Sequence, residues 1–347
     1  MSLRKTVGPA VVAVLVVSAP VDGRQDRAPY AVLGTIPDRV DGQMLRTFAY
    51  DQAGARLYAG SDRGLFWVDL AGPARDLRLK GPMFRKDIRK IEFAENLGRL
   101  FYATDQEVGY VDVRTGGEPM RLRIRLVAHD IAYEPTAREL YVAARDPYLM
   151  VFDAPSGEFG LRVSLPGWYA TSLEAAPGRV YLHVSPNTGF SVVDGASHRV
   201  SAWPVKGVVA PAYLEADPEG QYLFLSYDRY IAAVDAKTGT VLGRVVAPYA
   251  PSIAFDPGSR LLIATWNDDP PPTKITAFRV GPEGLTAVAH LSNPRIGDVG
   301  VEPMHRGFVQ RGTSALILWA FREPEGLSAG SRSPLFPARA PGRPSGR

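Results

Sequence analysis

The sequence predicts an all-β fold: a seven-bladed β-propeller of four-stranded antiparallel blades, with the ring closed by the N-terminal strand pairing into the last blade. Three observations predict this architecture. A pattern of apolar residues and turns recurs at steps of 41 to 43 residues, and four strands in about 40–45 residues is the period of a propeller blade. Glycine and proline are frequent, and a segment near the start of the chain matches the outer strand of a later repeat.

The composition excludes several classes of protein. The chain has 347 residues, 46% of them hydrophobic, which suits a globular protein with a large core. Its 34 glycines and 30 prolines require frequent turns and argue against a helical bundle. It has no cysteine, which excludes disulfides, cysteine-bound zinc, iron–sulfur clusters and thiol catalysis.

Residues 1–27 resemble a secretory signal peptide followed by a short leader. Arg4 and Lys5 precede an apolar stretch at 11–17 that is too short to span a bilayer comfortably, and small residues up to Ala19 offer a cleavage site. Cleavage further along the chain and an uncleaved anchor are the alternatives. We expect export to the periplasm or the exterior of a bacterium, with no integral membrane span after signal cleavage.

The propeller predicted over residues 28–321 rests on two lines of repeated sequence. In the first, two apolar residues are followed by aspartate, at steps of 43, 41, 41 and 41 residues. The repeated aspartates are Asp69, Asp112, Asp153, Asp194 and Asp235. We expect each to end a strand and to cap the following turn through backbone N–H groups. A metal-binding role is the alternative, but a ring of equivalent positions does not converge on one ion.

The second line places a short apolar strand after a turn rich in Asp, Pro and Gly, as at Asp217-Pro218-Glu219-Gly220. Such turns connect the strands of hairpins. Residues 211–247 show the unit most clearly. The four strands expected in it are 213–216, 221–226, 230–234 and 241–246. Each unit therefore consists of an inner strand, two middle strands and an outer strand.

The last repeat, near residues 302–321, lacks an outer strand of its own. Residues 31–37, near the start of the chain, match the outer strand expected at 240–246. We therefore expect the N-terminal strand to complete the last blade. Such an arrangement removes an exposed strand edge, which is a liability in β proteins.

The repeat apolar–Asp-Pro-x-Gly–x-Leu-Tyr-Val–turn–x-Val-x-Asp–x-x-Thr-Gly resembles the YVTN repeat of bacterial seven-bladed propellers, and residues 88–280 carry it most clearly. The resemblance implies a propeller architecture and, for most members, export or surface association with a binding or scaffolding role. Relatives also include lactonases and subunits of quinone-linked dehydrogenases. Their catalytic residues have no matching motif in this sequence.

The positive charge of the chain lies at its two ends. The formal net charge is +4, of which residues 1–27 carry +2 and residues 322–347 carry +3. The body between them has a net charge of −1. We expect no nucleic-acid partner, because such a partner requires clustered Lys and Arg on the folded surface. The Pro-, Gly- and Arg-rich tail at 322–347 is predicted to be disordered.

No familiar catalytic or cofactor motif is present. The sequence lacks phosphate-binding glycine-rich loops, the nucleophile elbow Gly-x-Ser-x-Gly and the zinc motif His-Glu-x-x-His, and its 5 histidines have no metal-ligand spacing. We therefore expect no cofactor, no metal and no catalytic residue. A cation site at the paired Asp268 and Asp269, in a proline-rich loop, is the alternative.

The side chains expected to carry binding lie on the channel-mouth face, where the innermost strands of the propeller begin. Arg, Tyr, His and Asp are concentrated there, and Arg and Tyr are favoured at recognition surfaces. The predicted binding residues are Arg46, Arg89, His129, Asp130, Tyr169, Tyr213, Tyr249, Arg295 and Asp298. The alternative interpretation is that these loop tips are polar only because they are solvated.

These observations predict an exported, non-enzymatic propeller that binds a protein, a peptide or an envelope glycan on its channel-mouth face. Two alternatives stay open. One is a lactonase- or hydrolase-like enzyme whose site is built from His129, Asp130, Asp298 and His305. The other is a scaffold subunit of a larger envelope or redox complex.

Overall fold

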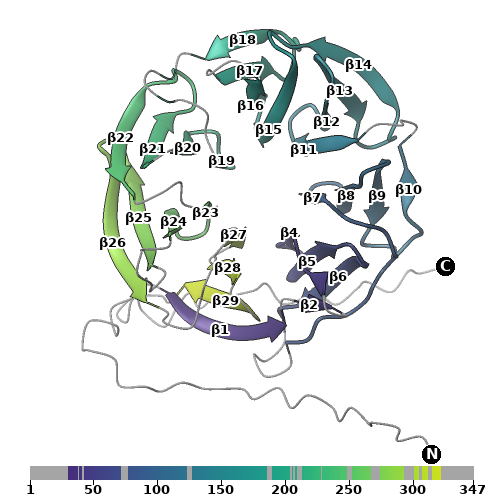
Figure 1. Ribbon diagram of the computed structural model, residues 1–347, viewed down its shortest axis with the longest axis horizontal. Helices are drawn as coiled ribbons and strands as arrows, with labels where there is room; N and C mark the ends of the chain where they lie inside the picture. Colours follow the sequence, from purple (N-terminus) through teal and green to yellow (C-terminus); the bar gives the residue numbers. More distant parts are fainter. Residues whose placement is uncertain are drawn as a thin grey trace, which may run out of the picture.

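The computed structural model is an all-β propeller whose sheets are arranged around a central axis (Figure 1). It describes residues 30–37, 39–40, 43–71, 77–122, 127–185, 190–203, 205, 208, 213–227, 229–247, 252–266, 274–292, 301–304, 307–311 and 315–321. The predicted leader at 1–27 and the predicted tail at 322–347 lie outside these residues. Within the described ranges, no helix is long and apolar enough to cross a bilayer.

The strands of each sheet are antiparallel and are counted here outward from the axis. The innermost strands are β4 (Thr47–Asp51), β7 (Lys90–Ala94), β11 (Ala128–Glu134), β15 (Tyr169–Ala176), β19 (Tyr213–Ala216), β23 (Ser252–Asp256) and β27 (Val301–Met304). The second strands are β5 (Arg56–Ser61), β8 (Arg99–Ala103), β12 (Glu139–Ala144), β16 (Arg179–Ser185), β20 (Tyr222–Tyr227), β24 (Leu261–Trp266) and β28 (Gly307–Arg311).

The outer half of the sheets is built in the same order. The third strands are β6 (Gly64–Asp69), β9 (Val108–Asp112), β13 (Tyr148–Asp153), β17 (Phe190–Asp194), β21 (Tyr230–Asp235), β25 (Lys274–Gly281) and β29 (Ala315–Phe321). The outer strands are β10 (Met120–Arg121), β14 (Phe159–Ser164), β18 (Val200–Trp203), β22 (Val241–Val246), β26 (Gly284–Ser292) and β1 (Tyr30–Pro37). A short hairpin of β2 (Arg39–Val40) and β3 (Gln43–Met44) precedes β4.

The prediction of seven four-stranded blades is wrong. Among the described residues six blades have four strands each, and the sheet β4-β5-β6 has three. The segment after β6 runs beside that strand and pairs with it at an isolated bridge between Trp67 and Lys80, and Leu65 exchanges two further backbone hydrogen bonds with Met83 and Phe84. Gly81 then takes a positive φ of 119°, and Pro82 has no N–H to donate, so the ladder is interrupted. Among the described residues between β6 and β7, the pairing is therefore not continuous enough to form a fourth strand of this sheet.

The N-terminal strand β1 lies antiparallel to β29, as the outer strand of the sheet that contains β27 and β28. Its register pairs Ile36 with Leu316 and has a bulge between Val32 and Gly34. Ile36 is buried in the apolar core of the neighbouring sheet β4-β5-β6. This pairing supplies one of the six four-stranded blades. The expected ring of seven such blades, closed by that strand, is not the architecture observed.

The repeated aspartates end the third strands, and four of the five cap the turn that follows. Asp112 accepts hydrogen bonds from the N–H groups of the two residues at 114 and 115, each at 3.0 Å. The others that accept such bonds are Asp153, Asp194 and Asp235. Asp69 differs, because its carboxylate pairs with Arg56 and Lys80.

Apolar clusters fill the space between adjacent sheets, and side chains of the innermost strands add hydrogen bonds across these junctions. Asp130 in β11 accepts the N–H of Leu173 in β15 at 2.9 Å. Glu215 in β19 accepts the N–H of Phe255 in β23 at 3.1 Å. Each of these bonds spans one repeat of the sequence. They fix the innermost strands to one another and thereby position the loops from which those strands begin.

Candidate functional site

The innermost strands begin and the outer strands end on one face of the ring, which we call the top face, and the opposite face is the bottom face. The strand register establishes this arrangement. Tyr148 at the start of β13 pairs with Ser164 at the end of β14, and Tyr230 at the start of β21 pairs with Val246 at the end of β22. The top face is therefore the surface on which the sequence predicted binding.

Arg46 and Arg89 share a carboxylate partner on the top face. Nη1 of Arg46 donates to Oδ1 of Asp87 at 2.8 Å, and Nη2 of Arg89 donates to Oδ2 of Asp105 at 2.6 Å. Arg89 also lies 3.4 Å from Asp87, which therefore bridges the two guanidinium groups. The hydrogen bond to Asp105 and the charge of Asp87 raise the pKa of Arg89. The two predicted arginines thus belong to one solvated ion-pair network.

His129 and Tyr169 are brought together, whereas the neighbouring Asp130 is part of the internal structure. The rings of His129 and Tyr169 stack with their centroids 5.7 Å apart. Asp130 is buried, and its two carboxylate oxygens accept the N–H groups of Ile131 and Leu173. Its carboxylate therefore joins β11 to β15 across the junction. No pattern in the sequence identifies Leu173 as its partner.

The other predicted residues divide into one that is exposed and three that lie outside the described residues. Tyr213 begins β19, and 47% of its surface is exposed. Those outside the described ranges are Tyr249, Arg295 and Asp298, together with His305 of the alternative enzyme site. That enzyme site is therefore described only at His129, whose ring lies on Tyr169, and at Asp130, whose oxygens bind backbone N–H groups.

Exposed apolar side chains lie on the top face, and only one of them, Tyr213, is among the nine binding residues predicted from the sequence. Among the described residues ten large hydrophobic side chains are strongly exposed, and six of these lie on the top face. The six are Val127, Tyr148, Trp168, Tyr213, Tyr230 and Val246. Trp168 and Val246 are the most exposed, at 69% and 74%. Trp168 directly precedes the start of β15, so the strand-start rule that selected Tyr169 contained a signal for it.

Carboxylates from several innermost strands also meet near the axis. Burial raises the pKa of Glu174 well above its ordinary value, and the carboxylates of Glu215 and Glu92 raise it further, whereas Lys90 opposes them. Glu174 therefore binds a proton more tightly in the folded chain than in the unfolded chain. In the part of the chain that the structure describes, no three His, Asp or Glu side chains are grouped to hold a metal ion.

Comparisons with known proteins reveal a shared fold. No family model matches the chain, and no curated protein matches it by sequence. The solved structure of the RRP9 WD40 repeats matches with 9% identity and a TM-score of 0.67, over 85% of this chain and 98% of that one. A chain of the mitotic checkpoint complex matches with 13% identity and a TM-score of 0.62, over 90% of this chain and 99% of that one.

Likeness at such low identity identifies the architecture only. In all, 1673 solved chains match, so the fold is widely used and does not indicate one activity. The resemblance to the bacterial YVTN repeat stays an expectation, since no sequence comparison supports it. The chain has a WD40-type β-propeller fold.

Proposed function

We propose that this propeller is a protein-interaction scaffold that binds its partner on the top face. The observation that carries this proposal is the gathering of six exposed large apolar side chains on that face. Trp and Tyr are effective anchors of interfaces, because each buries a large apolar area while keeping a polar group for hydrogen bonding. A likeness to WD40-type folds, one of them within a complex, is compatible with scaffolding.

The top face has two sectors of different chemistry. The sector of Arg46 and Arg89 is polar, and the carboxylates of Asp87 and Asp105 neutralise it. The sector that contains Trp168 carries exposed aromatic side chains, among them Tyr148. Protein interfaces have an apolar core and a polar rim. We therefore expect an apolar segment of the partner to cover the aromatic sector, with the ion-pair network at the rim.

Alanine variants on the two faces test this proposal. A triple variant, Trp168→Ala, Tyr213→Ala and Tyr230→Ala, removes three aromatic anchors from the top face. The matched control is Phe159→Ala, because Phe159 is 49% exposed and lies at the bottom end of β14. All four positions are exposed, so we expect both proteins to fold, which circular dichroism checks.

The immobilised full chain and its variants are incubated with an extract of the bacterial envelope, and bound material is quantified. We expect the triple variant to capture partner protein in an amount reduced about tenfold or more relative to the parent, because anchor residues dominate the binding energy. We expect the Phe159→Ala control to bind as the parent does. Equal capture by the parent and the triple variant contradicts the proposal, and capture that survives proteolysis of the extract indicates a glycan ligand instead.

The scaffold is further proposed to act outside the bacterial cytoplasm. Its support is the sequence of residues 1–27, with positive residues followed by a short apolar stretch. N-terminal sequencing of the protein recovered from periplasmic and cytoplasmic fractions tests this part. We expect a shortened chain in the periplasm, whereas an intact chain confined to the cytoplasm contradicts export.

A further inference from the structure

Arginine side chains join neighbouring sheets near the bottom face. At two junctions, the arginine that begins a second strand reaches the turn after the third strand of the next sheet. Nη1 of Arg99 donates to the carbonyl of Ala154, and Nη1 of Arg179 donates to the carbonyl of Ala236, each at 2.6 Å. The hydroxyl of Tyr181, two residues after Arg179, donates to the same Ala236 carbonyl at 2.9 Å. These bonds close the junctions.

The junction between the sheets β4-β5-β6 and β7–β10 has an arginine and a tyrosine at the same positions as Arg179 and Tyr181. These two side chains do not form hydrogen bonds to the turn of the next sheet. Arg56 and Tyr58 occupy the two equivalent positions in the register, and Val113 is the equivalent turn residue. Nε of Arg56 instead donates to Asp69 of its own sheet at 2.8 Å. The hydroxyl of Tyr58 is buried and donates to no acceptor among the described residues, and the guanidinium of Arg56, on the same sheet, interacts with its oxygen.

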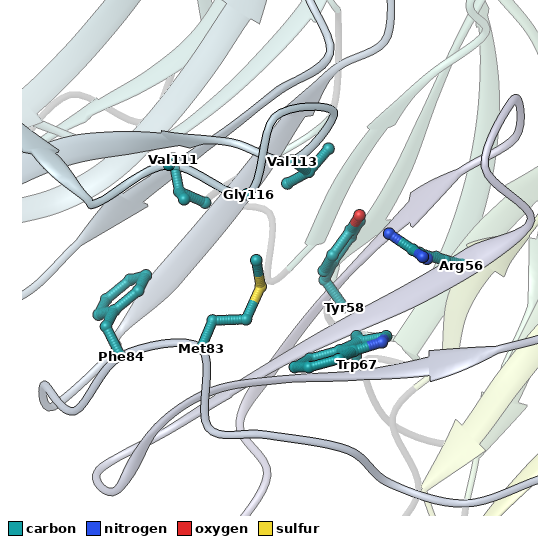
Figure 2. Close-up of a pocket in the computed structure, with 9 residues that line it drawn as sticks. Arg56, Tyr58, Trp67, Met83, Phe84, Val111, Val113 and Gly116 are labelled. Atoms are coloured by element: carbon teal, nitrogen blue, oxygen red, sulfur yellow. The ribbon is translucent and has the colours of Figure 1, made fainter. Parts of the chain in front are cut away.

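This junction contains a cleft of about 330 Å³ (Figure 2). Tyr58 and Arg56 point from one wall toward Val113 and the loop at Gly116 on the other (Figure 2). The apolar part of the lining consists of Trp67, Met83, Phe84 and Val111. A Cβ added at Gly116 meets nothing within 4 Å, so this loop leaves space at the edge of the cleft.

The polar end of the cleft contains two cations, Arg56 and Lys80, and the carboxylates of Asp69 and Asp51 lie near it. Arg56 and Lys80 both pair with the single carboxylate of Asp69. Burial raises the pKa of Asp69, but the hydrogen bonds from Lys80 and Arg56 lower it more, and the net shift is downward. Burial, with a contribution from Asp51, raises the pKa of Tyr58 to about 12. The Tyr58 hydroxyl therefore keeps its proton at neutral pH and is available as a donor.

We infer that this cleft binds a small molecule that carries a carboxylate on an apolar body. The Tyr58 hydroxyl lacks the acceptor that a turn carbonyl supplies to Tyr181, and a ligand carboxylate beside Arg56 supplies one. Hydrogen bonds to a carboxylate are charge-assisted and are stronger than neutral ones. The guanidinium of Arg56 complements the ligand carboxylate, and the apolar body of the ligand packs against Trp67 and Met83.

The size of the cleft limits the ligand. An apolar cavity of about 150 Å³ holds one benzene molecule. The volume of about 330 Å³ therefore accommodates a phenyl ring with a short side chain and leaves no room for a long peptide. The cleft lies near the bottom face, so binding there is independent of the partner proposed for the top face.

The experiment uses 3-phenylpropionate as the probe, with 3-phenylpropionamide and acetate for comparison. The full chain is labelled with ¹³C at the methyl groups of its 6 methionines, and Met83→Leu identifies the Met83 signal by its loss. We expect the Met83 signal to shift with 3-phenylpropionate and to saturate. We expect the amide to bind at least about tenfold more weakly, because it lacks the charge, and acetate to cause no saturating shift.

Two matched substitutions assign binding to the cleft. Tyr58→Phe removes one donor, so we expect the Kd for 3-phenylpropionate to rise about five- to tenfold. Tyr181→Phe makes the same chemical change at a bridged junction and should leave the Kd within about twofold. Tyr58→Phe removes a hydroxyl that donates to no acceptor among the described residues, so the protein should fold normally. No saturating Met83 shift, equal Kd values for acid and amide, or an unchanged Kd in Tyr58→Phe overturns the inference.

Discussion

Replacing Tyr58 and, in a separate protein, Tyr181 by phenylalanine removes one hydroxyl from two equivalent positions of the fold. Both tyrosines are 1% exposed, so each substitution leaves the apolar packing nearly unchanged. The hydroxyl of Tyr181 donates to the carbonyl of Ala236 at 2.9 Å, whereas the hydroxyl of Tyr58 donates to no acceptor among the described residues. The pair of variants therefore isolates the contribution of one hydrogen bond between sheets.

The expected changes in the free energy of unfolding have opposite signs. Tyr181→Phe loses a hydrogen bond with a net contribution of about 1 kcal/mol. The Ala236 carbonyl keeps its bond from Arg179, so no buried acceptor is left without a partner. Burying a hydroxyl whose O–H has no acceptor costs about 1–3 kcal/mol, so Tyr58→Phe should stabilise the chain by about 1 kcal/mol. The two variants should differ by about 2 kcal/mol.

Equilibrium unfolding in urea measures both variants against the parent, with tryptophan fluorescence and far-ultraviolet circular dichroism as probes. Coincident transitions and equal slopes against urea concentration permit comparison of the midpoints. We expect a higher midpoint for Tyr58→Phe and a lower midpoint for Tyr181→Phe. If both variants lose stability by the same amount, the Tyr58 hydroxyl has a partner in solution and the difference between the junctions is not real.

The pH dependence of stability and the two ends of the chain give three further expectations. Glu174 binds its proton more tightly when folded, so the parent should lose stability as the pH rises from about 4.3 through the raised pKa of Glu174. Glu174→Gln should therefore have a higher Tm than the parent near pH 8 and a similar Tm near pH 4, and identical profiles contradict this. Deleting residues 28–37 removes β1 and the buried Ile36, so we expect aggregation or a Tm several degrees lower. Deleting 322–347, which has few apolar residues, should leave the Tm nearly unchanged, and similar losses in both truncations contradict the role assigned to β1.

The positions of many strands could be predicted because they depend on local sequence. The strands expected at 213–216 and 230–234 correspond to β19 at Tyr213–Ala216 and β21 at Tyr230–Asp235. The capping aspartates are also local, since each bonds to residues two or three positions later. The predicted number of four-stranded blades was wrong. An outer strand requires a continuous ladder of hydrogen bonds, and the sequence repeat does not indicate that this ladder is interrupted at Gly81.

The face that carries the candidate site could be predicted from the sequence. Which of its side chains are exposed, and which are already bonded to other residues, could not. Topology alone places strand starts such as those at Arg46 and Tyr213 on one surface. Whether a side chain is available depends on partners far away in sequence, as when Asp87 binds Arg46 or Leu173 binds Asp130. The cleft gave no signal at all. Arg56 and Tyr58 of the cleft occupy the same register positions as Arg179 and Tyr181 at another junction. The two pairs differ only in their hydrogen bonds.

Site-specific photo-crosslinking decides whether the partner binds on the top face. A photoreactive phenylalanine analogue replaces Trp168 in one protein and Phe159 in another, so that each face carries one exposed probe. Both full chains are illuminated in the same envelope extract, and crosslinked proteins are identified by mass spectrometry. We expect a specific crosslinked protein from position 168 and none from position 159. A specific crosslink from position 159 alone would place the partner on the bottom face and contradict the proposed function.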